Sequence, residues 1–276
     1  MHSRFGNNVL ITGASSGIGL ASALLFAEKG FKVWGVSRSA TSDSSDGNNI
    51  IMHRMDVTDD SSVASKIASI WEEAVSMTGR GISIIIHCAG MGIAGTAEET
   101  SHADATMQFE TNYFGVLRVN RVLLPLMRFQ GPSLVIVVGS VAGRICVPFQ
   151  SHYSASKSAL ESYVEALRIE GRPFGIHATI IEPGDTNTGF TGSRRSVIPE
   201  DSPYAMQAKR SITKMEQDEL HGASAKAVAK VIVRMPQKKR LPIRRAVGIT
   251  YKLMLFAKRF LPDRLVELIV SKLYAS

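Results

Sequence analysis

The sequence predicts an α/β fold, a doubly wound parallel sheet with helices on both faces, and three observations support this. Short apolar runs alternate with longer segments of helical spacing over most of the 276 residues. The runs are continuous and rich in β-branched residues, which is typical of parallel strands buried on both faces. A glycine-rich turn directly follows the first run. A strand, such a turn and a helix in this order are how sheets of this class begin.

Each element follows from its residues. The apolar runs predict strands at 8–12, 32–37, 83–88, 133–139 and 177–183, and a weaker strand at 49–55. Apolar residues three and four apart predict helices at 18–29, 61–77, 103–129 and 153–170.

Two irregular stretches interrupt this alternation. Residues 37–49 are rich in Ser, Asp and Gly, and we interpret them as a surface loop inside the domain. Residues 191–203 come just after a strand end, where sheets of this class bind ligands. We therefore expect a flap and a short helical insert at about 190–219.

Composition limits the class of protein. Hydrophobic residues make up 45% of the chain and charged residues 20%, as is ordinary for a globular protein with a sizeable core. Two cysteines, Cys88 and Cys146, provide neither a disulfide framework nor a metal cluster, so we expect no metal and a reducing compartment. The N-terminal residues lack the apolar stretch of a signal peptide. Together these features predict a cytoplasmic protein.

The positive charge is concentrated at the C-terminal end. Ten Lys and Arg residues but two acidic residues follow Gln237, so this stretch alone accounts for the net charge of +8. We predict that 1–236 form a single catalytic domain and that 237–276 form a basic, amphipathic helical extension. Since no motif of a nucleic-acid reader accompanies the basic residues, we expect no nucleic-acid partner.

The role of this extension stays open at the level of sequence. Its apolar residues cluster at 253–257 and 265–270, and no run approaches the roughly 20 apolar residues that span a bilayer. A basic amphipathic helix can lie on an anionic membrane, which would give peripheral membrane contact through 238–276. The same helices could instead cap a substrate pocket, pack against a partner subunit or stay disordered.

The glycine-rich turn reads TGASSGIG and spans residues 12–19. Gly13 permits a tight turn, Gly17 lets the backbone approach a pyrophosphate, and Gly19 lets the helix pack closely. The N-terminus of the following helix presents free N–H groups to a phosphate. The turn therefore predicts dinucleotide binding on a Rossmann-type sheet, with contacts from the glycines and from Ser15, Ser16 and Ile18.

The end of the second strand indicates which dinucleotide binds. An acidic residue there would bind the 2′-OH of NAD, whereas an arginine suits the 2′-phosphate of NADP. The strand ends in Ser37-Arg38-Ser39, and the first acidic residue is Asp43. Because Arg38 offers a planar guanidinium and Ser37 does not repel the phosphate, we expect NADP(H) as the preferred cofactor, with NAD(H) as the alternative.

Six further motifs follow in order: MDVTD (55–59), HCAG (87–90), TNYFG (111–115), GSVAG (139–143), YSASK (153–157) and EPGDTNT (182–188). With them, residues 6–190 closely resemble the classical short-chain dehydrogenase/reductase family. The resemblance implies an oxidoreductase that interconverts alcohols and carbonyls with a nicotinamide cofactor. It also implies a catalytic tetrad of Asn112, Ser140, Tyr153 and Lys157.

The resemblance extends the set of cofactor contacts. Asp56 and Val57 would lie against the adenine, and Pro183, Gly184 and Thr186 would hold the nicotinamide carboxamide. The remaining implied contacts are Cys88, Ala89, Gly90, Tyr153 and Lys157.

One motif departs from the family. His87-Cys88 stands where the family usually has two asparagines that help to hold the central strands. The departure questions the local rigidity rather than the chemistry. We interpret Cys88 as a small buried residue and not as a reactive thiol.

The spacing of Tyr153 and Lys157 suits proton transfer. Four residues are about one helical turn, so both side chains emerge on the same face. A free tyrosine has a pKa of about 10, and a nearby ammonium favours its phenolate, so Tyr153 can serve as acid and base. Ser140 would hydrogen-bond the substrate oxygen. By resemblance, Asn112 holds a water that links Lys157 to solvent.

The substrate is less sharply indicated. Residues 139–184 resemble the hydroxysteroid, retinol and lipid carbonyl-reductase branch of the family, so we expect a small lipophilic carbonyl or alcohol. We expect the substrate to contact Ser140, Val147, Phe149, Tyr153 and Phe190, with Met91, Ile93 and Met206 as further candidates for an apolar wall.

Alternatives to this function follow from the same residues. A 3-oxoacyl or ketosphingoid-type lipid reductase is the main alternative among enzymes. A non-catalytic dinucleotide-binding regulator is the rival from another class, although such proteins usually lose part of the tetrad. The resemblance further implies a homodimer or homotetramer that forms through the helices at 103–129 and 153–170.

Overall fold

The computed structural model describes residues 3–40, 44–46 and 49–275. The strands are β1 (Asn8–Thr12), β2 (Lys32–Ser37), β3 (Ser44–Asp46), β4 (Ile50–Arg54), β5 (Ile84–His87), β6 (Ile93–Ala94), β7 (Ser133–Val138), β8 (Ile176–Glu182), β9 (Thr186–Asn187), β10 (Arg195–Ser196), β11 (Ala223–Ser224) and β12 (Arg244–Ala246). The helices are α1 (Gly17–Glu28), α2 (Asp60–Thr78), α3 (His102–Phe109), α4 (Gly115–Gln130), α5 (Ser151–Glu170), α6 (Phe190–Ser193), α7 (Ala205–Leu220), α8 (Ala225–Ile232), α9 (Ile249–Ala257) and α10 (Asp263–Tyr274).

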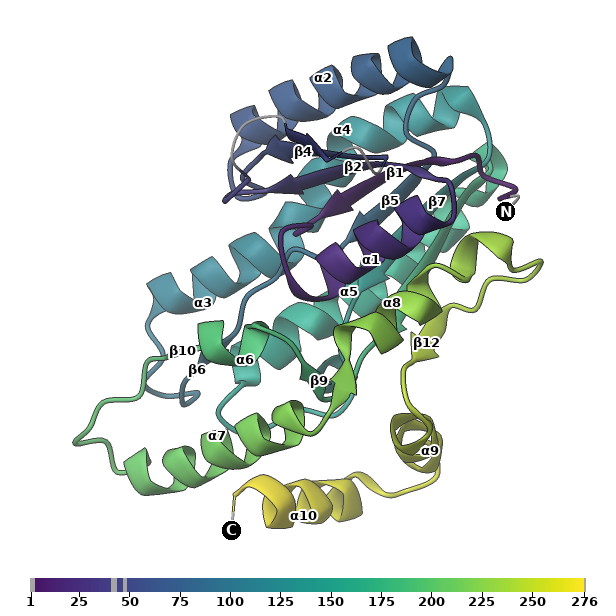
Figure 1. The fold of residues 1–276 in the computed structure, drawn as a ribbon. Coiled ribbons are helices and arrows are strands. Elements are labelled where there is room, and N and C mark those ends of the chain that lie inside the picture. The colour runs from purple at the N-terminus through teal and green to yellow at the C-terminus, as the bar shows by residue number, and fades with distance from the viewer. Residues whose placement is uncertain (1–2, 41–43, 47–48, 276) are drawn as a thin grey trace.

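The central sheet has the order β12-β8-β7-β5-β1-β2-β4-β3. Neighbouring strands from β12 to β4 pair in parallel, and β3 pairs antiparallel with β4 at the edge. The chain starts in the middle of the sheet and builds outward in both directions, as Figure 1 shows. The predicted doubly wound parallel sheet is therefore confirmed, with the predicted strands in it.

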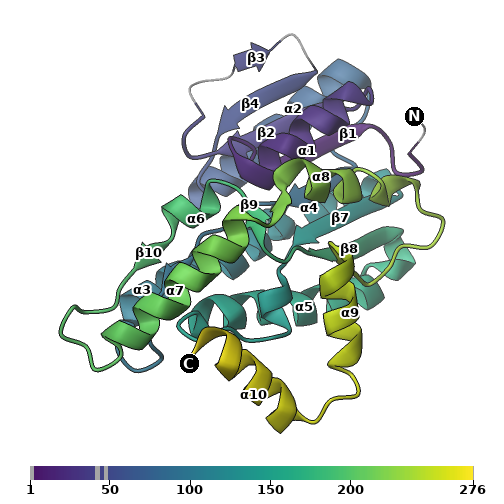
Figure 2. The same cartoon turned by 60° about the horizontal axis from the view of Figure 1, so that its bottom comes forward.

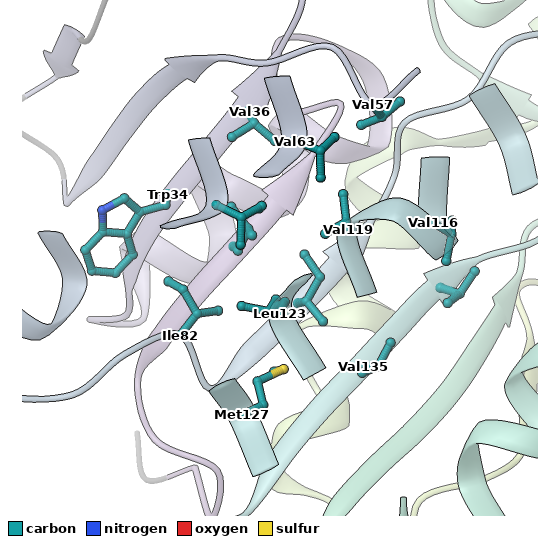
Figure 3. Packing of buried hydrophobic residues seen from close by; sticks show 14 of the residues in the cluster. Trp34, Val36, Val57, Val63, Ile82, Val116, Val119, Leu123, Met127 and Val135 are labelled. Carbon is teal, nitrogen blue, oxygen red and sulfur yellow. The ribbon is translucent and has the colours of Figure 1, made fainter. Parts of the chain in front are cut away.

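Alternating side chains of the strands feed two hydrophobic layers. Leu10 of β1 packs under α2, α4 and α5, whereas its neighbours Val9 and Ile11 pack on the other face, under α1 and α8. Figure 3 shows the first layer, with the fully buried Trp34 of β2 beside residues from α2 and α4. Since both faces are covered, the central strands are mostly apolar, which is why their runs were visible in the sequence.

Three predicted segments differ in detail. The helix expected at 103–129 is divided into α3 and α4 by a π-helical turn at Glu110–Phe114. The stretch expected at about 190–219 contains α6, β10 and α7. The polar loop at 37–49 includes β3, and its Asp43 lies outside the described residues.

The C-terminal extension is partly integral to the sheet. β12 lies beyond the expected boundary after residue 236, yet it pairs in parallel with β8 from Arg244 to Ala246. After β12 the chain leaves the sheet and forms α9 and α10, which lie at the bottom of Figure 1 and form a V at the front of Figure 2. Among the described residues no helix is both long and apolar enough to cross a membrane.

Candidate active site

The glycine turn links β1 to α1 in a conformation that requires its glycines. Gly13 has a φ of 67°, and a Cβ at this position would lie 2.8 Å from the backbone nitrogen of Ala89. A Cβ on Gly19 would lie 2.1 Å from the carbonyl oxygen of Gly13. Larger residues would thus force the turn away from both β5 and α1. The Thr12 hydroxyl accepts the N–H groups of Cys88 and Ala89 at 3.2 Å, which holds the ends of β1 and β5 together.

One cavity of about 890 Å³ extends from this turn to Tyr153 and Lys157. Every residue for which the sequence predicted a cofactor contact lines it, from Gly13 through Asp56 to Thr186. Thr188 and Gly189 also line it and were missed. The strands β1, β2, β5, β7 and β8 all end at this cavity, because parallel strands present their carboxyl ends at one edge of the sheet.

The residues present fit a dinucleotide. Ser37 is buried at the end of β2, and its hydroxyl has no hydrogen-bond partner within the described part of the chain. The next residue, Arg38, is exposed at the rim of the cavity. Asp56 already accepts the backbone N–H and the hydroxyl of Thr58, at 2.9 and 2.8 Å, so its position beside the cavity is fixed. These groups would hold the adenosine part of a dinucleotide.

Tyr153 and Ser140 meet at the same cavity from different elements. Tyr153 lies near the start of α5, and Ser140 follows β7, where its hydroxyl accepts the N–H of Ala142 at 3.1 Å. Burial raises the pKa of Tyr153 to about 12, while a hydrogen bond with Ser140 acts in the opposite direction. The Tyr153 phenol is therefore protonated at neutral pH, so it can donate a proton.

Lys157 lies one helical turn beyond Tyr153, as predicted. Its Nζ donates to the Val138 carbonyl at 3.0 Å and lies 5.8 Å from the centre of the Tyr153 ring. Burial lowers the pKa of Lys157 to about 8. At neutral pH its ammonium is still the major form and stands beside the phenol.

Asn112 lies behind the cavity wall, in the π-helical turn. Its amide oxygen accepts the Met91 N–H at 2.8 Å, and its Nδ2 donates to the Met91 carbonyl and to the Ser156 hydroxyl at 3.1 Å. A Cβ on Gly90 would lie 3.4 Å from Asn112 Oδ1 and 3.8 Å from Lys157 Nζ, so Gly90 lies between them. The predicted tetrad thus comes together, with Asn112 next to Lys157 rather than at the cavity surface.

The predicted substrate contacts are only partly brought together. Val147 and Phe190 line the cavity, and the Phe190 ring centre lies 5.8 Å from that of Tyr153. Phe149 does not line it, which corrects the expectation. Its backbone has a φ of 61°, and its carbonyl accepts the N–H of Gly95, so this residue serves to connect two loops.

The three further wall candidates also lie elsewhere. Ile93 is buried in β6, and the backbone of Met91 holds Asn112. Met206 is 75% exposed on α7. These residues were candidates because their side chains are apolar, but Ile93 belongs to the core and Met206 to an exposed helix face.

The rest of the substrate wall comes from the C-terminal helices. We call α9, α10 and the turn between them, residues 249–274, the lid. Apolar residues from both of its helices line the cavity, among them Met254, Val266 and Val270. Capping of the pocket, one of the alternatives that the sequence left open, is what the structure shows. The apolar clusters at 253–257 and 265–270 indicated that these helices bury one side, but the sequence did not show against what they pack.

A few polar contacts hold the lid in place. The Tyr251 hydroxyl donates to the Asp185 carboxylate and accepts the Asp185 N–H at 3.0 Å. The Tyr251 ring lies so close to Gly184 that a Cβ there would be 2.2 Å from it. At the other end of α9, Lys258 donates to the Arg144 carbonyl. These contacts connect the lid to the loop that contains Gly184 and Asp185 and to the loop that follows Ser140.

The departure at His87-Cys88 has a structural explanation. His87 Nε2 lies 3.0 Å from Asn120 Oδ1, and Asn120 Nδ2 donates to the Tyr163 hydroxyl at 3.0 Å. Burial lowers the pKa of His87 to about 4, so the neutral ring donates to Asn120. Burial also raises the pKa of Cys88 to about 12, so its thiol stays protonated. The chain from His87 to Tyr163 ties β5 to α4 and α5.

A group of buried charges lies beside the tetrad. Glu161, one turn beyond Lys157, accepts Arg244 Nε at 2.6 Å, and Glu182 at the end of β8 lies 3.6 Å from Arg144. Burial, followed by the charge of Glu182, raises the pKa of Glu161 to about 7. The pKa of Glu182 is also raised, mainly by burial. Through Arg244, β12 is therefore connected to the catalytic helix.

The assembled geometry defines a class of protein. A dinucleotide-binding turn, a buried phenol beside an ammonium and an apolar pocket in one cavity are the parts of a nicotinamide-dependent oxidoreductase. The comparisons with known proteins agree. The family model described as short chain dehydrogenase matches residues 7–198. The chain belongs to this family, whose members act on alcohol and carbonyl groups.

Individual relatives cover almost the whole chain. The 3-ketodihydrosphingosine reductase of Bacteroides thetaiotaomicron is 35% identical over 270 residues, which are 97% of each chain. Retinol dehydrogenase 8 of Homo sapiens is 30% identical over 262 residues, which are 88% of this chain and 82% of that protein. The crystal structure of a short-chain dehydrogenase from Streptomyces avermitilis matches with a TM-score of 0.78 at 28% identity and 97% coverage of both chains.

Proposed function

We propose that this enzyme interconverts a carbonyl and a secondary alcohol on a lipophilic substrate, with NADP(H) as cofactor and Tyr153 as acid and base. The observation that carries the proposal is the composition of the 890 Å³ cavity. It contains the glycine turn and Arg38, the Tyr153 phenol, and the apolar inner side of the lid. A dinucleotide and an apolar substrate would thus meet next to a proton donor.

When bound, the nicotinamide supplies the hydride in reduction and accepts it in oxidation. The proton is handled by the chain. In reduction, Tyr153 donates its phenolic proton to the carbonyl oxygen, and Ser140 hydrogen-bonds the same oxygen as it gains negative charge. The Lys157 ammonium stabilises the phenolate that is left. In oxidation, that phenolate takes the proton of the alcohol.

Lys157 also connects the site to Asn112. The raised pKa of Tyr153 favours the protonated phenol, so the phenolate formed in reduction must regain a proton quickly. Lys157, whose pKa is about 8, can release and rebind a proton near neutrality. Asn112, on the far side of Gly90, would hold a water molecule that returns a proton to Lys157. This relay makes repeated turnover compatible with a buried phenol.

NADP(H) is proposed over NAD(H) because of the end of β2. Arg38 is exposed at the cavity rim, where its guanidinium can contact a 2′-phosphate, and the described residues place no acidic side chain of β2 beside it. The orphan hydroxyl of Ser37 would donate to or accept from the ribose. A carboxylate at this place would instead have repelled the phosphate.

A lipid ketone is the substrate class that the pocket favours. Its walls beyond Tyr153 include Val147, Phe190 and apolar residues of the lid, which suit hydrocarbon, together with a few polar residues such as Gln150 and Glu219. Two relatives are named for lipid substrates, a ketosphingoid base and retinol. The first of these, similar over the full length, supports a ketosphingoid-type or 3-oxoacyl reductase as the second candidate beside a steroid-like ketone.

The decisive experiment measures NADPH oxidation with a panel of steroid, retinoid, acyl, sphingoid and small ketones, with NADH in parallel. We expect turnover with at least one lipophilic ketone, and a loss of about 10²- to 10⁴-fold in kcat for Tyr153→Phe. Tyr163→Phe, which also removes a buried tyrosine hydroxyl on α5, is the matched control and should keep most of the activity. Unchanged turnover in Tyr153→Phe would exclude the mechanism, and a preference for NADH would exclude the role of Arg38.

Two properties of the whole molecule complete the proposal. We propose a homodimer or homotetramer that forms through α4 and α5, where Phe129 and Ile169 are 84% and 76% exposed. A cytoplasmic setting fits the two free cysteines, of which Cys146 is exposed and would oxidise elsewhere. Light scattering after size-exclusion chromatography tests the oligomeric state, and fractionation of cells tests the cytoplasmic setting.

A further inference from the structure

The outer side of the lid carries apolar side chains that the fold leaves uncovered. On α9 and in the turn after it, Ile249, Leu253, Phe256 and Phe260 recur four, three and four residues apart, so they form one stripe along the helix. They are 74%, 63%, 59% and 73% exposed. Phe256 and Phe260 pack edge to face with ring centres 5.3 Å apart. Leu265 and Leu268 of α10 are exposed as well.

The stripe is not the side of these helices that packs on the rest of the protein, because their opposite side already lines the cavity. Tyr251, Met254 and Lys258 line the cavity, and they lie about half a helical turn away from the stripe. The lid is thus apolar on both sides. Its inner side covers the pocket, whereas its outer side is exposed on the V-shaped pair of helices at the edge of the molecule (Figure 2). Contiguous exposed apolar surface of this kind marks an interaction site.

The charges around the stripe indicate the partner. Lys252 and Arg259 flank it on α9, and Arg264 and Lys272 are exposed on the outer side of α10 beside Leu265 and Leu268. The lid contains two acidic residues, Asp263 and Glu267, so its charge is clearly positive. Apolar side chains with flanking Lys and Arg are suited to the boundary between the acyl chains and the anionic head groups of a bilayer.

We propose that the outer lid face, defined by the stripe, the two leucines and these four basic residues, docks on an anionic lipid bilayer. The phenylalanines enter the acyl boundary and the basic residues contact lipid phosphates. The lid then lies between the bilayer and the cavity, so that a lipophilic ketone passes from one apolar phase to the other without crossing water. The proposal rests on the proposed function for this last point, whereas docking itself requires no turnover.

Vesicle co-sedimentation of the full chain tests the docking. We expect binding to vesicles of phosphatidylcholine mixed with phosphatidylglycerol, weaker binding to phosphatidylcholine alone, and loss of binding at high salt. The double change Phe256→Ser/Phe260→Ser should lower the partition coefficient at least about tenfold for both vesicle types. Lys252→Glu/Arg259→Glu should lower it at least about tenfold for the anionic vesicles alone.

Two controls match these variants away from the lid. Met77→Ser removes a 51% exposed apolar side chain on α2, and Lys226→Glu/Lys230→Glu reverses two exposed charges on α8. Both should bind vesicles as the unchanged protein does. NADPH turnover with a small water-soluble ketone should stay within about twofold in the lid variants, because their side chains do not line the cavity.

Three outcomes would overturn the proposal. The first is that the unchanged protein does not sediment with anionic vesicles. The second is that the control variants lose as much vesicle binding as the lid variants. The third is a dimer that dissociates on Phe256→Ser/Phe260→Ser, which would show that a second copy of the chain occupies this face. Binding to vesicles without reduction of any ketone would instead exclude the proposed function and leave the docking intact.

Discussion

The cofactor end of the cavity is formed by turns between buried strands and helices, whereas its substrate end is closed by two helices that follow the last strand. At the first end, Gly13 lies so close to the Ala89 backbone that a Cβ would not fit, and Thr12 holds β1 to β5. At the second, α9 rests on the Tyr251–Asp185 and Lys258–Arg144 contacts. The difference teaches that one cavity can combine a closely packed turn at one end with a cover held by few polar contacts at the other, and we expect such a cover to open more readily.

The largest effect is expected at the rigid end. Replacing Arg38 with serine would remove the proposed charge-assisted contact to the 2′-phosphate, so the KM for NADPH should rise about 10- to 100-fold while the KM for NADH changes little. Steady-state kinetics with both cofactors would show this. Arg121→Ser, which alters an exposed arginine outside the cavity, should leave both constants unchanged. An equal rise of KM for NADPH and NADH would mean that Arg38 does not contact the 2′-phosphate.

An intermediate effect is expected at the lid. Tyr251→Phe removes both hydrogen bonds to Asp185 but keeps the ring against Gly184. The lid should open more often, so the KM of a lipophilic ketone should rise about fivefold, with kcat changed less than about twofold. Hydrogen exchange in α9 should increase. Tyr204→Phe, which removes a hydroxyl that donates to Glu98 at 2.7 Å, is the matched control. A fall in kcat alone would contradict a role in covering the pocket.

The smallest effect concerns the charges that connect β12 to α5. The pKa of Glu161 is raised from 4.5 to about 7, so the folded chain retains a proton that the unfolded chain has released above pH 4.5. Stability from this group is therefore fully present below pH 4.5 and is lost as the pH rises through about 7. The melting temperature should fall by a few degrees between pH 5 and pH 8, at about 2–4 °C for each kcal/mol.

Variants of the two glutamates that bind Arg244 separate this effect from general surface charge. In Glu161→Gln, the fall of the melting temperature between pH 5 and pH 8 should be clearly smaller. In Glu165→Gln, which alters the more exposed partner of Arg244, the melting temperature should fall as in the unchanged protein. A melting temperature that is flat from pH 5 to pH 8 in the unchanged protein would show that Glu161 is not the titrating group.

Much of the fold and of the catalytic site could be predicted because the determinants are local. Strands buried on both faces need apolar residues on both sides, so β1, β2, β5, β7 and β8 appear as nearly continuous apolar runs. The chemistry of the tetrad depends on residue type at the strand ends and on one helical turn between Tyr153 and Lys157. Cysteine at position 88 and histidine at 87 were visible as a departure, but the chain through Asn120 to Tyr163 was not, because it joins residues far apart in sequence.

The misses share a different cause. Phe149, Met91, Ile93 and Met206 were chosen as apolar residues near the motifs, and the side on which each lies depends on loop conformation, such as the positive φ of Phe149. β12 was assigned to a separate extension because its sequence, Arg-Arg-Ala, belongs to the basic stretch that follows Gln237. Edge position and the Glu161–Arg244 bond allow that composition, and neither can be seen from residues 244–246 alone.

By itself, the sequence determined the parallel sheet and the glycine-rich turn after its first strand, and it supplied the candidates for proton transfer, since each depends on backbone periodicity or on short motifs along the chain. The tertiary structure decided what covers the substrate. Helices that are apolar on two sides can turn either side toward a pocket, a partner or a membrane. The orientation of α9 is fixed by Tyr251, whose ring packs on Gly184 and whose hydroxyl binds Asp185, more than sixty residues earlier in the chain. That long-range contact turns one side of α9 toward the cavity and leaves the other side exposed.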